Sequence, residues 1–471
     1  MTDGKTADKK PAGKNNSQKQ NAVKLPRELA LDTLMEILEK GDFSHTLLNK
    51  TLKNQKNLTK QDRSFITRLV EGTLERLITL DYILNAFSKV KVNKMKPFIR
   101  NLLRMSLYQL KYMDQVPDSA VCNEAVKLAE KRGFKPLSGF VNGVLRNIAR
   151  SSDKDILPSE DKDKVNFLSV FYSTPEWMIE KWLREYDYET VKNMLSAQFE
   201  EKSYTTIRVN TARNTPEELT DILKAEGIEV IKGSYLNCAL KIKDFDSMDS
   251  IKAFREGRFT VQDESSMFIG LIAGIKENDR IIDVCGAPGG KALHGAELLK
   301  GTGMIEARDV SDYKVALIQE NITRMGFHNM KAVKKDATVK DEESIGLADI
   351  VIADLPCSGL GVIGKKPDIK YNMTEEKQQE LVKLQREILS VVSSYVKKGG
   401  TLIYSTCTIN SNENLKNVEW FMANYPFQLT SIEDCLPSEF PYTTKGEGYL
   451  QLIPGVNDTD GFFMAKLTKG L

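Results

Sequence analysis

The chain of 471 residues is predicted to be a multidomain protein with an all-helical N-terminal bundle, a small α+β insert and a C-terminal α/β domain. Three observations predict this architecture. The length exceeds what one hydrophobic core usually serves. Apolar residues recur at helical spacing, without strand-like alternation, from Pro26 to about Arg150. From Phe259 onward, apolar strands, glycine-rich turns and helices alternate, which is typical of a doubly wound parallel sheet.

The first 152 residues divide into a tail and a helical domain. Residues 1–24 are polar and lysine-rich without aromatic residues, so a disordered basic tail is expected. An apolar stripe that starts at Ala30 and a candidate N-cap residue, Thr59, mark helices of a domain over 25–152. Six basic residues cluster around one connection between helices: Lys89, Lys91, Lys94, Lys96, Arg100 and Arg104. Phosphate contact and ordinary solvation explain this cluster equally well.

The next two units have different patterns. Residues 153–255 are predicted to hold linker helices, which contain Trp177 and Trp182, followed by the small α+β subdomain. Its expected elements are strands over 205–210, 228–231 and 239–242 and a helix over 216–225. The α/β domain is then expected over residues 256–471.

Composition restricts the class of protein. Hydrophobic residues make up 41% and charged residues 28% of the chain, which is typical of a soluble globular protein. No apolar stretch approaches the ~20 residues of a membrane helix, and no secretory signal is expected. The six cysteines show no C-x-x-C pattern and stand beside only three histidines. We therefore expect neither disulfides nor a metal site, and a cytoplasmic protein.

The net charge of +2 conceals an asymmetry. Residues 1–150 hold 28 Lys and Arg against 15 Asp and Glu, a net charge of +13, while the rest of the chain holds 39 against 50, a net charge of −11. A basic module joined to an acidic one predicts a polyanionic partner that is gripped mainly by the N-terminal part. A merely solvated basic surface is the alternative.

A glycine-rich turn follows the buried strand over 280–284. It consists of Cys285, Gly286, Ala287, Pro288, Gly289, Gly290 and Lys291. Glycines let the backbone approach a ligand, and the helix that follows presents free N–H groups. Asp309, at the end of the next strand, lies where this fold places a ribose acceptor, and Asp336 ends the third strand and could meet an adenine. For each aspartate, a helix N-cap is the alternative role.

Two cysteines follow predicted strand ends, in Asp354-Leu355-Pro356-Cys357 and Ser405-Thr406-Cys407. Ligands bind outside the carboxyl ends of strands in such sheets, so a cofactor turn, a carboxylate and two thiols should share one cleft. This predicts covalent thiol chemistry beside a nucleotide-like cofactor. The remaining cysteines are expected to be structural, with Cys285 packing the glycine turn.

These motifs resemble those of the RNA cytosine-5 methyltransferases. Asp283–Lys291, Asp354–Cys357 and Thr406-Cys407 look like the cofactor, proline–cysteine and threonine–cysteine motifs of that family. Four further stretches extend the match: Arg208–Asn210, Val261–Ser266, Val362–Ile369 and Asp460–Lys466. The helical part resembles the NusB-like RNA-binding domain that marks the bacterial 16S ribosomal RNA subfamily known as RsmB, Sun or Fmu. The resemblance covers residues 25–471, with one departure at Gly286, where alanine is more common and glycine should only loosen the turn.

The resemblance implies an RRM-like small subdomain and a Rossmann-like class I methyltransferase domain that uses S-adenosyl-L-methionine. The turn over 285–291, Asp309, Asp336 and Asp354 would bind this cofactor. Cys407 would attack C6 of cytosine, Cys357 would assist product release, and Asp354 would hydrogen-bond the cytosine edge. The motif leaves open whether the lysine of the turn supplies positive charge to the site or is a plain surface residue.

The expected partner is 16S ribosomal RNA, unassembled or in a partly assembled small subunit, with no membrane or metal and with a monomeric enzyme. One alternative is a tRNA or 23S rRNA cytosine-5 methyltransferase with the same catalytic domain. Another is a non-catalytic RNA-binding or ribosome-assembly factor, against which the intact cysteines and glycine turn argue. A DNA methyltransferase and a dinucleotide enzyme are disfavoured, the latter because two thiols would have no task. An ATPase is disfavoured because no G-x-x-x-x-G-K-[ST] motif is present.

Overall fold

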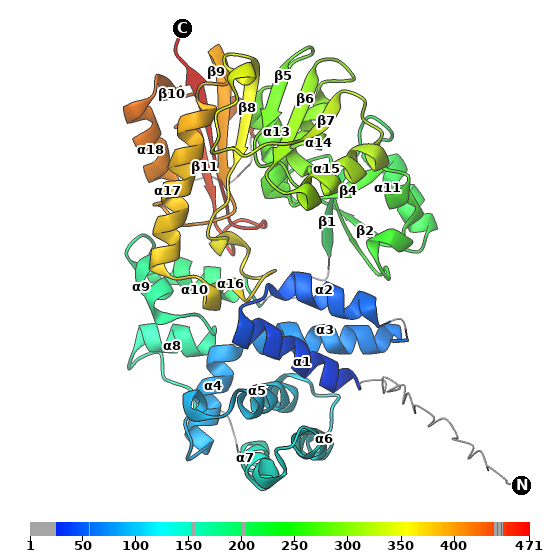
Figure 1. Ribbon diagram of the computed structural model, residues 1–471, viewed down its shortest axis with the longest axis vertical. Coiled ribbons are helices and arrows are strands. Elements are labelled where there is room, and N and C mark those ends of the chain that lie inside the picture. The colour runs from blue at the N-terminus through cyan, green and yellow to red at the C-terminus, as the bar shows by residue number, and fades with distance from the viewer. Residues whose placement is uncertain are drawn as a thin grey trace, which may run out of the picture.

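The computed structural model describes residues 25–55, 57–151, 156–199, 204–437, 440, 444 and 446–471. Figure 1 shows a large sheet flanked by helices at the top, a small sheet to its lower right and a helical bundle below, with linker helices on the left. This arrangement confirms the predicted fold class. The basic tail expected at residues 1–24 lies outside the described residues, as does the boundary expected at 152.

Apolar residues from every helix of the N-terminal bundle form one core. The helices are α1 (Pro26–Lys40), α2 (Ser44–Asn54), α3 (Lys60–Glu75), α4 (Leu77–Phe87), α5 (Pro97–Tyr112), α6 (Asp118–Lys131) and α7 (Ser138–Ala149). Thr59 caps α3 as predicted, because its hydroxyl accepts a hydrogen bond from the amide of Asp62 at 3.1 Å. Of the basic cluster, Arg100 pairs with Glu39 at 2.7 Å, and Arg104 pairs with an aspartate of α4. These two arginines therefore stabilise the bundle.

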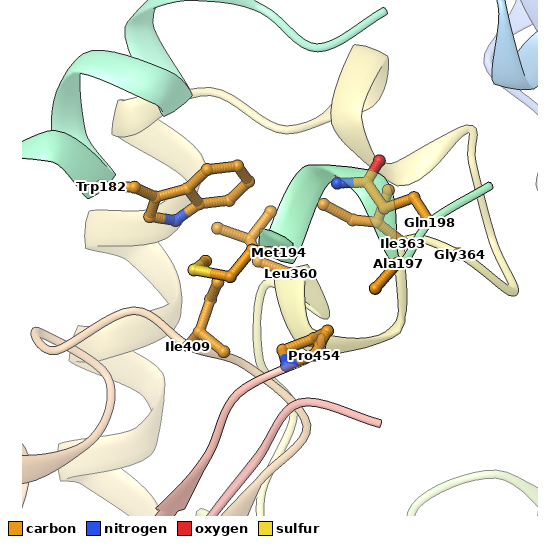
Figure 2. A pocket seen from close by; sticks show the side chains of 10 residues that line it. Trp182, Met194, Ala197, Gln198, Leu360, Ile363, Gly364, Ile409 and Pro454 are labelled. Carbon is orange, nitrogen blue, oxygen red and sulfur yellow. The ribbon is translucent and has the colours of Figure 1, made fainter. Parts of the chain in front are cut away.

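Three linker helices join the bundle to the large domain. They are α8 (Lys164–Phe171), α9 (Glu176–Leu183) and α10 (Tyr188–Ser196). Figure 2 shows Trp182 and Met194 of these helices against Leu360, Ile409 and Pro454 of the large domain. The void between them is about 20 Å³, which is room for about one water molecule. The joint is therefore a packed apolar contact beside the loops that follow the cysteine motifs.

The small subdomain is a four-stranded antiparallel sheet with the order β2-β3-β1-β4. Its elements are β1 (Thr205–Val209), α11 (Pro216–Ala225), β2 (Glu229–Lys232), β3 (Ala239–Lys243), α12 (Lys252–Arg255) and β4 (Phe259–Val261). The sheet extends beyond residue 255, where the sequence placed the domain boundary. The last strand has only three residues and runs almost directly into the next helix, so it resembles the start of the α/β pattern.

The large domain contains an eight-stranded sheet with the order β10-β12-β9-β8-β5-β6-β7, with β11 paired to β12. The strands are β5 (Arg280–Asp283), β6 (Met304–Asp309), β7 (Met330–Lys334), β8 (Ala348–Asp354), β9 (Val396–Thr406), β10 (Phe427–Leu429), β11 (Tyr449–Leu452) and β12 (Phe462–Lys469). The adjacent strands β7, β6, β5, β8 and β9 run parallel to one another. The chain first adds β6 and β7 on one side of β5 and then crosses over to add β8 and β9 on its other side. This is the topological switch point at which such sheets bind ligands.

Helices cover both faces of this sheet because neighbouring strand residues point to opposite sides. Ile281 packs into the core with α13 (Glu264–Ala273), α14 (Gly290–Leu298) and α15 (Asp312–Met325). Ile282 packs into the opposite core with α17 (Glu375–Val392) and α18 (Leu415–Asn424). No helix in the described part of the chain is long and apolar enough to span a membrane.

The bundle docks on a short helix of the large domain, α16 (Ile369–Asn372). Asp368, just before it, accepts hydrogen bonds from the hydroxyl and the amide of Ser44. Lys370 is buried and donates to the backbone carbonyl of Glu75 at 3.2 Å. Burial lowers the pKa of Lys370 to about 7. The bundle is therefore packed against the segment that follows residues 360–364 of the large domain.

Candidate active site

The two cysteine motifs meet because their strands are neighbours in register. Asp354 at the end of β8 lies opposite Ser405 near the end of β9. The chain turns after each strand, and this brings the sulfur of Cys357 to 3.3 Å from that of Cys407. Both thiols are partly exposed. The predicted juxtaposition of two free thiols at the carboxyl ends of adjacent strands is thus present.

The surroundings distinguish the two thiols. The hydrogen bond between the two sulfurs lowers the pKa of Cys407, and Lys291 and Lys366 act in the same direction, against burial and the nearby Asp354. The same hydrogen bond, together with burial, raises the pKa of Cys357. Either sulfur can donate this hydrogen bond, and the directions of the two pKa shifts favour Cys407 as the thiol that ionises first, which would make Cys357 the donor.

Asp354 lies beside these thiols and is held by two hydrogen bonds. One of its oxygens accepts from the ammonium of Lys291 at 2.7 Å, and the other accepts from the hydroxyl of Ser405 at 2.8 Å. Burial alone would lower the pKa of Lys291, but attraction to Asp354 and to Asp283 outweighs it and raises that pKa. Lys291, whose side chain is 14% exposed, is therefore a largely enclosed cation of the site and not the surface lysine that the sequence left possible.

The glycine-rich turn links β5 to α14 beside this pair. The amide of Gly286 donates to the carbonyl of Arg308 at 2.8 Å, which ties the turn to the end of β6. The peptide bond between Ala287 and Pro288 is cis, and Gly289 has a φ of 112°, which favours glycine. A Cβ at Gly286 would lie 3.0 Å from a carboxylate oxygen of Asp283. Glycine therefore does more than loosen the turn, because it leaves space beside this carboxylate.

Unsatisfied buried polar groups surround the turn. Among the described residues, neither carboxylate oxygen of Asp283 has a hydrogen bond of normal geometry, nor has the amide nitrogen of Gln262. Gln262 lies beside the helix start, 3.6 Å from the position of a Cβ at Gly290. Burial and the nearby Asp354 raise the pKa of Asp283 to about 7, against Lys291 and the Cys285 amide. Buried groups without partners are uncommon in folded proteins, so a ligand with donors and acceptors would fit here.

The remaining predicted residues lie around the same sheet edge. Asp309 is buried at the end of β6, and Lys314 lies 3.4 Å from its carboxylate. Asp336 is exposed, and its carboxylate accepts from the amide and the hydroxyl of Thr338, at 2.9 and 2.7 Å. Burial and the nearby aspartates raise the pKa of Cys285, which therefore stays a thiol. No group of three or more His, Cys, Asp or Glu side chains suited to a metal ion occurs among the described residues.

A buried network that sequence reasoning missed holds the two cysteine loops. Ser358 follows Cys357 and Thr408 follows Cys407, and their hydroxyls are 2.8 Å apart. Glu413, which is fully buried, accepts from the amide and hydroxyl of Ser358, from Asn410 and from Gln385. The sequence contains one signal of this network, which is the hydroxyl residue that follows each cysteine. Glu413 gives no such signal, since it resembles an ordinary acidic residue before a helix.

Comparisons with known proteins match each part of the chain. The family model of the 16S rRNA methyltransferase RsmB/F covers residues 271–468, that of the NusB family covers 24–150, and that of the RsmF/B-like ferredoxin-like domain covers 174–249. The chain resembles the solved structure of PH0851 with a TM-score of 0.79 and 27% identity, over 95% of this chain and 99% of that one. It also resembles NSun6 from Pyrococcus horikoshii, solved with SFG, with a TM-score of 0.52 and 25% identity, over 60% of this chain and 95% of that one.

Two curated relatives match nearly the whole chain. The probable ribosomal RNA small subunit methyltransferase B of Bacillus subtilis is 37% identical, over 94% of this chain and 98% of its own length. The protein of the same name from Synechocystis is 32% identical, over 94% and 99%. On these grounds, together with the paired strand-end motifs, the chain belongs to the ribosomal RNA small subunit methyltransferase B family.

Proposed function

We propose that this protein methylates C5 of a cytosine in 16S ribosomal RNA with S-adenosyl-L-methionine, through a covalent bond between Cys407 and C6 of the base. The observation that carries the proposal is the pair of thiols at 3.3 Å, of which Cys407 has the lowered pKa. C5 of cytosine is a weak nucleophile, and addition of a thiolate to C6 makes it strong enough to accept a methyl group. An unperturbed thiol with a pKa of ~8.5 is about 3% ionised at pH 7, so the site needs such a shift.

In the proposed reaction, the Cys407 thiolate forms a bond from Sγ to C6. C5 would then bond the methyl carbon as the methyl–sulfonium bond of the methyl donor breaks, with S-adenosyl-L-homocysteine as the leaving group. A base would take the proton on C5, and the electrons of that C–H bond would form the C5–C6 double bond as the C6–Sγ bond breaks and releases Cys407 as a thiolate. Cys357 would stabilise the resting thiolate as hydrogen-bond donor and would assist this elimination. Asp354, oriented by Lys291 and Ser405, would hydrogen-bond the edge of the cytosine.

The residues around the glycine turn fit the cofactor. S-adenosyl-L-methionine supplies an electrophilic methyl group and carries an ammonium that could satisfy the unpartnered carboxylate of Asp283. Asp309 would accept from the ribose hydroxyls, and the turn over 285–291 would approach the ligand with its backbone. Asp336 is proposed for the adenine side, although its carboxylate already bonds Thr338. The relative NSun6 was solved with SFG, an analogue of this cofactor, which supports the assignment.

The proposed partner is the RNA of the small subunit, free or partly assembled, in the cytoplasm. The names of the curated relatives support this substrate over tRNA and 23S rRNA. The thiol pair with its buried network disfavours a non-catalytic assembly factor, which would have no need for either. A monomeric enzyme without metal remains our expectation.

Bisulfite sequencing of ribosomal RNA, with and without the gene, tests the proposal. Loss of one methylcytosine from the 16S rRNA is expected, and the gene should restore it, whereas the gene with Cys407→Ala should not. Loss of a mark from tRNA or 23S rRNA instead would favour the alternative substrates. An unchanged pattern in all three RNAs would contradict the proposal.

A further inference from the structure

A basic cleft lies on the flank of the large domain, outside the active site. It occupies about 510 Å³ between α9, α17 and the start of α18, which meet at the left side of the molecule in Figure 1. Its charged lining residues are Lys181, Arg184, Lys383, Arg386 and Lys416, with Glu375 as the one carboxylate. This excess of five cations over one anion lies in the part of the chain whose net charge is negative.

Within the described part of the chain, none of the five cations lies within 4.0 Å of a carboxylate oxygen. Their hydrogen bonds go to neutral groups: Lys181 donates to Gln378 at 2.6 Å, and Lys416 donates to Asn412 at 3.0 Å. Some lysines elsewhere on the same domain are paired, as Lys365 is with Asp263 at 2.9 Å. Like charges held near one another repel, and an anion in the cleft would remove that repulsion.

The floor of the cleft has an unsatisfied group. Gln378 is 3% exposed, and its amide nitrogen has no hydrogen-bond partner among the described residues. Its oxygen is shared by Lys181 and, at 3.4 Å, by Asn410. Asn410 in turn donates to Glu413, which holds the loop of Cys357. The cleft is therefore connected by three hydrogen-bonded side chains to the network that holds the catalytic loops.

We propose that this cleft binds phosphates of the substrate RNA next to the target nucleotide. The inference rests on the proposed function, and it adds to the basic bundle a second anchor on the catalytic domain. Five cations from three helices exceed what one small anion needs, whereas successive phosphates of an RNA strand would engage them together. A strand bound there would lie beside the loop that follows Cys407. It would hold the backbone while the base is turned out of its stack.

The double variant Lys383→Ala/Lys416→Ala tests this inference, because both lysines are exposed and neither is part of a core. The matched control is Lys276→Ala/Lys398→Ala, which removes two exposed lysines near the opposite ends of the strands β5 and β9. The binding of full-length protein to a naked 16S rRNA transcript is measured between 0.1 and 1 M salt, on the order of the range in which phosphate contacts are screened.

Loss of two phosphate contacts should reduce the slope of log K against log salt by about 1.4, at ~0.7 per contact to a single strand. If the affinities converge near ~1 M salt, the cleft variant binds about 25-fold more weakly at 0.1 M. The control should bind like the wild type, and both variants should retain cofactor affinity and melting temperature.

An equal loss in both double variants, or an unchanged slope in the cleft variant, would overturn the proposal. Wild-type affinity for naked RNA combined with weaker binding to an assembling particle would also overturn it, and would indicate an acidic protein surface as the occupant. Methyl transfer to the same transcript is measured in parallel with the wild type. Its failure would contradict the proposed function, whereas the binding comparison would still decide whether the cleft holds RNA.

Discussion

Replacing Glu413 by glutamine should slow methyl transfer without affecting cofactor binding. Four hydrogen bonds to this buried carboxylate hold the loop after Cys357 and the segment after Cys407. Each carboxylate oxygen accepts two of these bonds, and an amide nitrogen cannot accept, so glutamine loses two bonds of about 2 kcal/mol each, about 4 kcal/mol together. Burying a neutral amide costs less free energy than burying a carboxylate. If this difference offsets half of the loss, about 2 kcal/mol remains, which corresponds to a fall of about 30-fold in the rate of methyl transfer.

The assay compares kcat for methyl transfer at saturating RNA and cofactor with the cofactor Kd. For Glu413→Gln, we expect kcat to fall about 30-fold while the Kd stays within about twofold, because the glycine turn belongs to other elements. The control is Glu419→Gln, an exposed glutamate on α18, which should behave like the wild type. A kcat within about twofold of the wild type in Glu413→Gln would refute the idea that this network positions the thiols.

Three further predictions concern the site itself. Cys357→Ala should form the C6 adduct but release it poorly, so a covalent RNA–protein species should survive denaturing gels, whereas Cys407→Ala and the double variant should form none; an adduct in Cys407→Ala would reverse the two roles. Because Lys291 lowers the pKa of Cys407, Lys291→Gln should shift the acidic limb of the pH–rate profile to higher pH, and an unmoved limb would exclude this electrostatic role. Asp309→Asn should weaken cofactor binding at least about tenfold by calorimetry, as expected for a charged hydrogen bond, while Asp336→Asn, whose carboxylate already serves Thr338, should weaken it less than about threefold; the opposite order would exchange the two assignments.

Local patterns predicted the architecture because each depends on neighbouring residues. Helical spacing revealed the bundle, and the helix over Pro216–Ala225 appears where its spacing placed it. β4 was assigned to the wrong unit because a three-residue strand is too short to show a period. The docking of the bundle on α16 escaped prediction for another reason. Lys370 is polar, and nothing in its own neighbourhood indicates that the carbonyl of Glu75 covers it.

The active site likewise combines features that follow from sequence patterns with features that depend on tertiary contacts. The position of both thiols followed from a rule of the fold, since parallel strands end at one edge of the sheet. The pairing of Asp354 with Lys291 did not follow, because it depends on how the glycine turn meets β8. The role of Glu413 could not be predicted from the sequence, because its hydrogen bonds form only when the two cysteine loops have come together. The catalytic roles of these residues remain predictions.

The contact between Ser44 and Asp368 joins residues that are 324 positions apart. During synthesis the bundle emerges first, and its own core lets it fold before the large domain exists. The segment that holds Asp368 and Lys370 is made much later and then docks on that preformed surface, and Cys407 follows it in the chain. A product that stopped before residue 354 would carry the basic bundle but neither thiol. If the protein acts as proposed and the bundle contributes to RNA binding, such a fragment would compete for RNA without modifying it, so complete synthesis of this chain matters more than its first domain alone suggests.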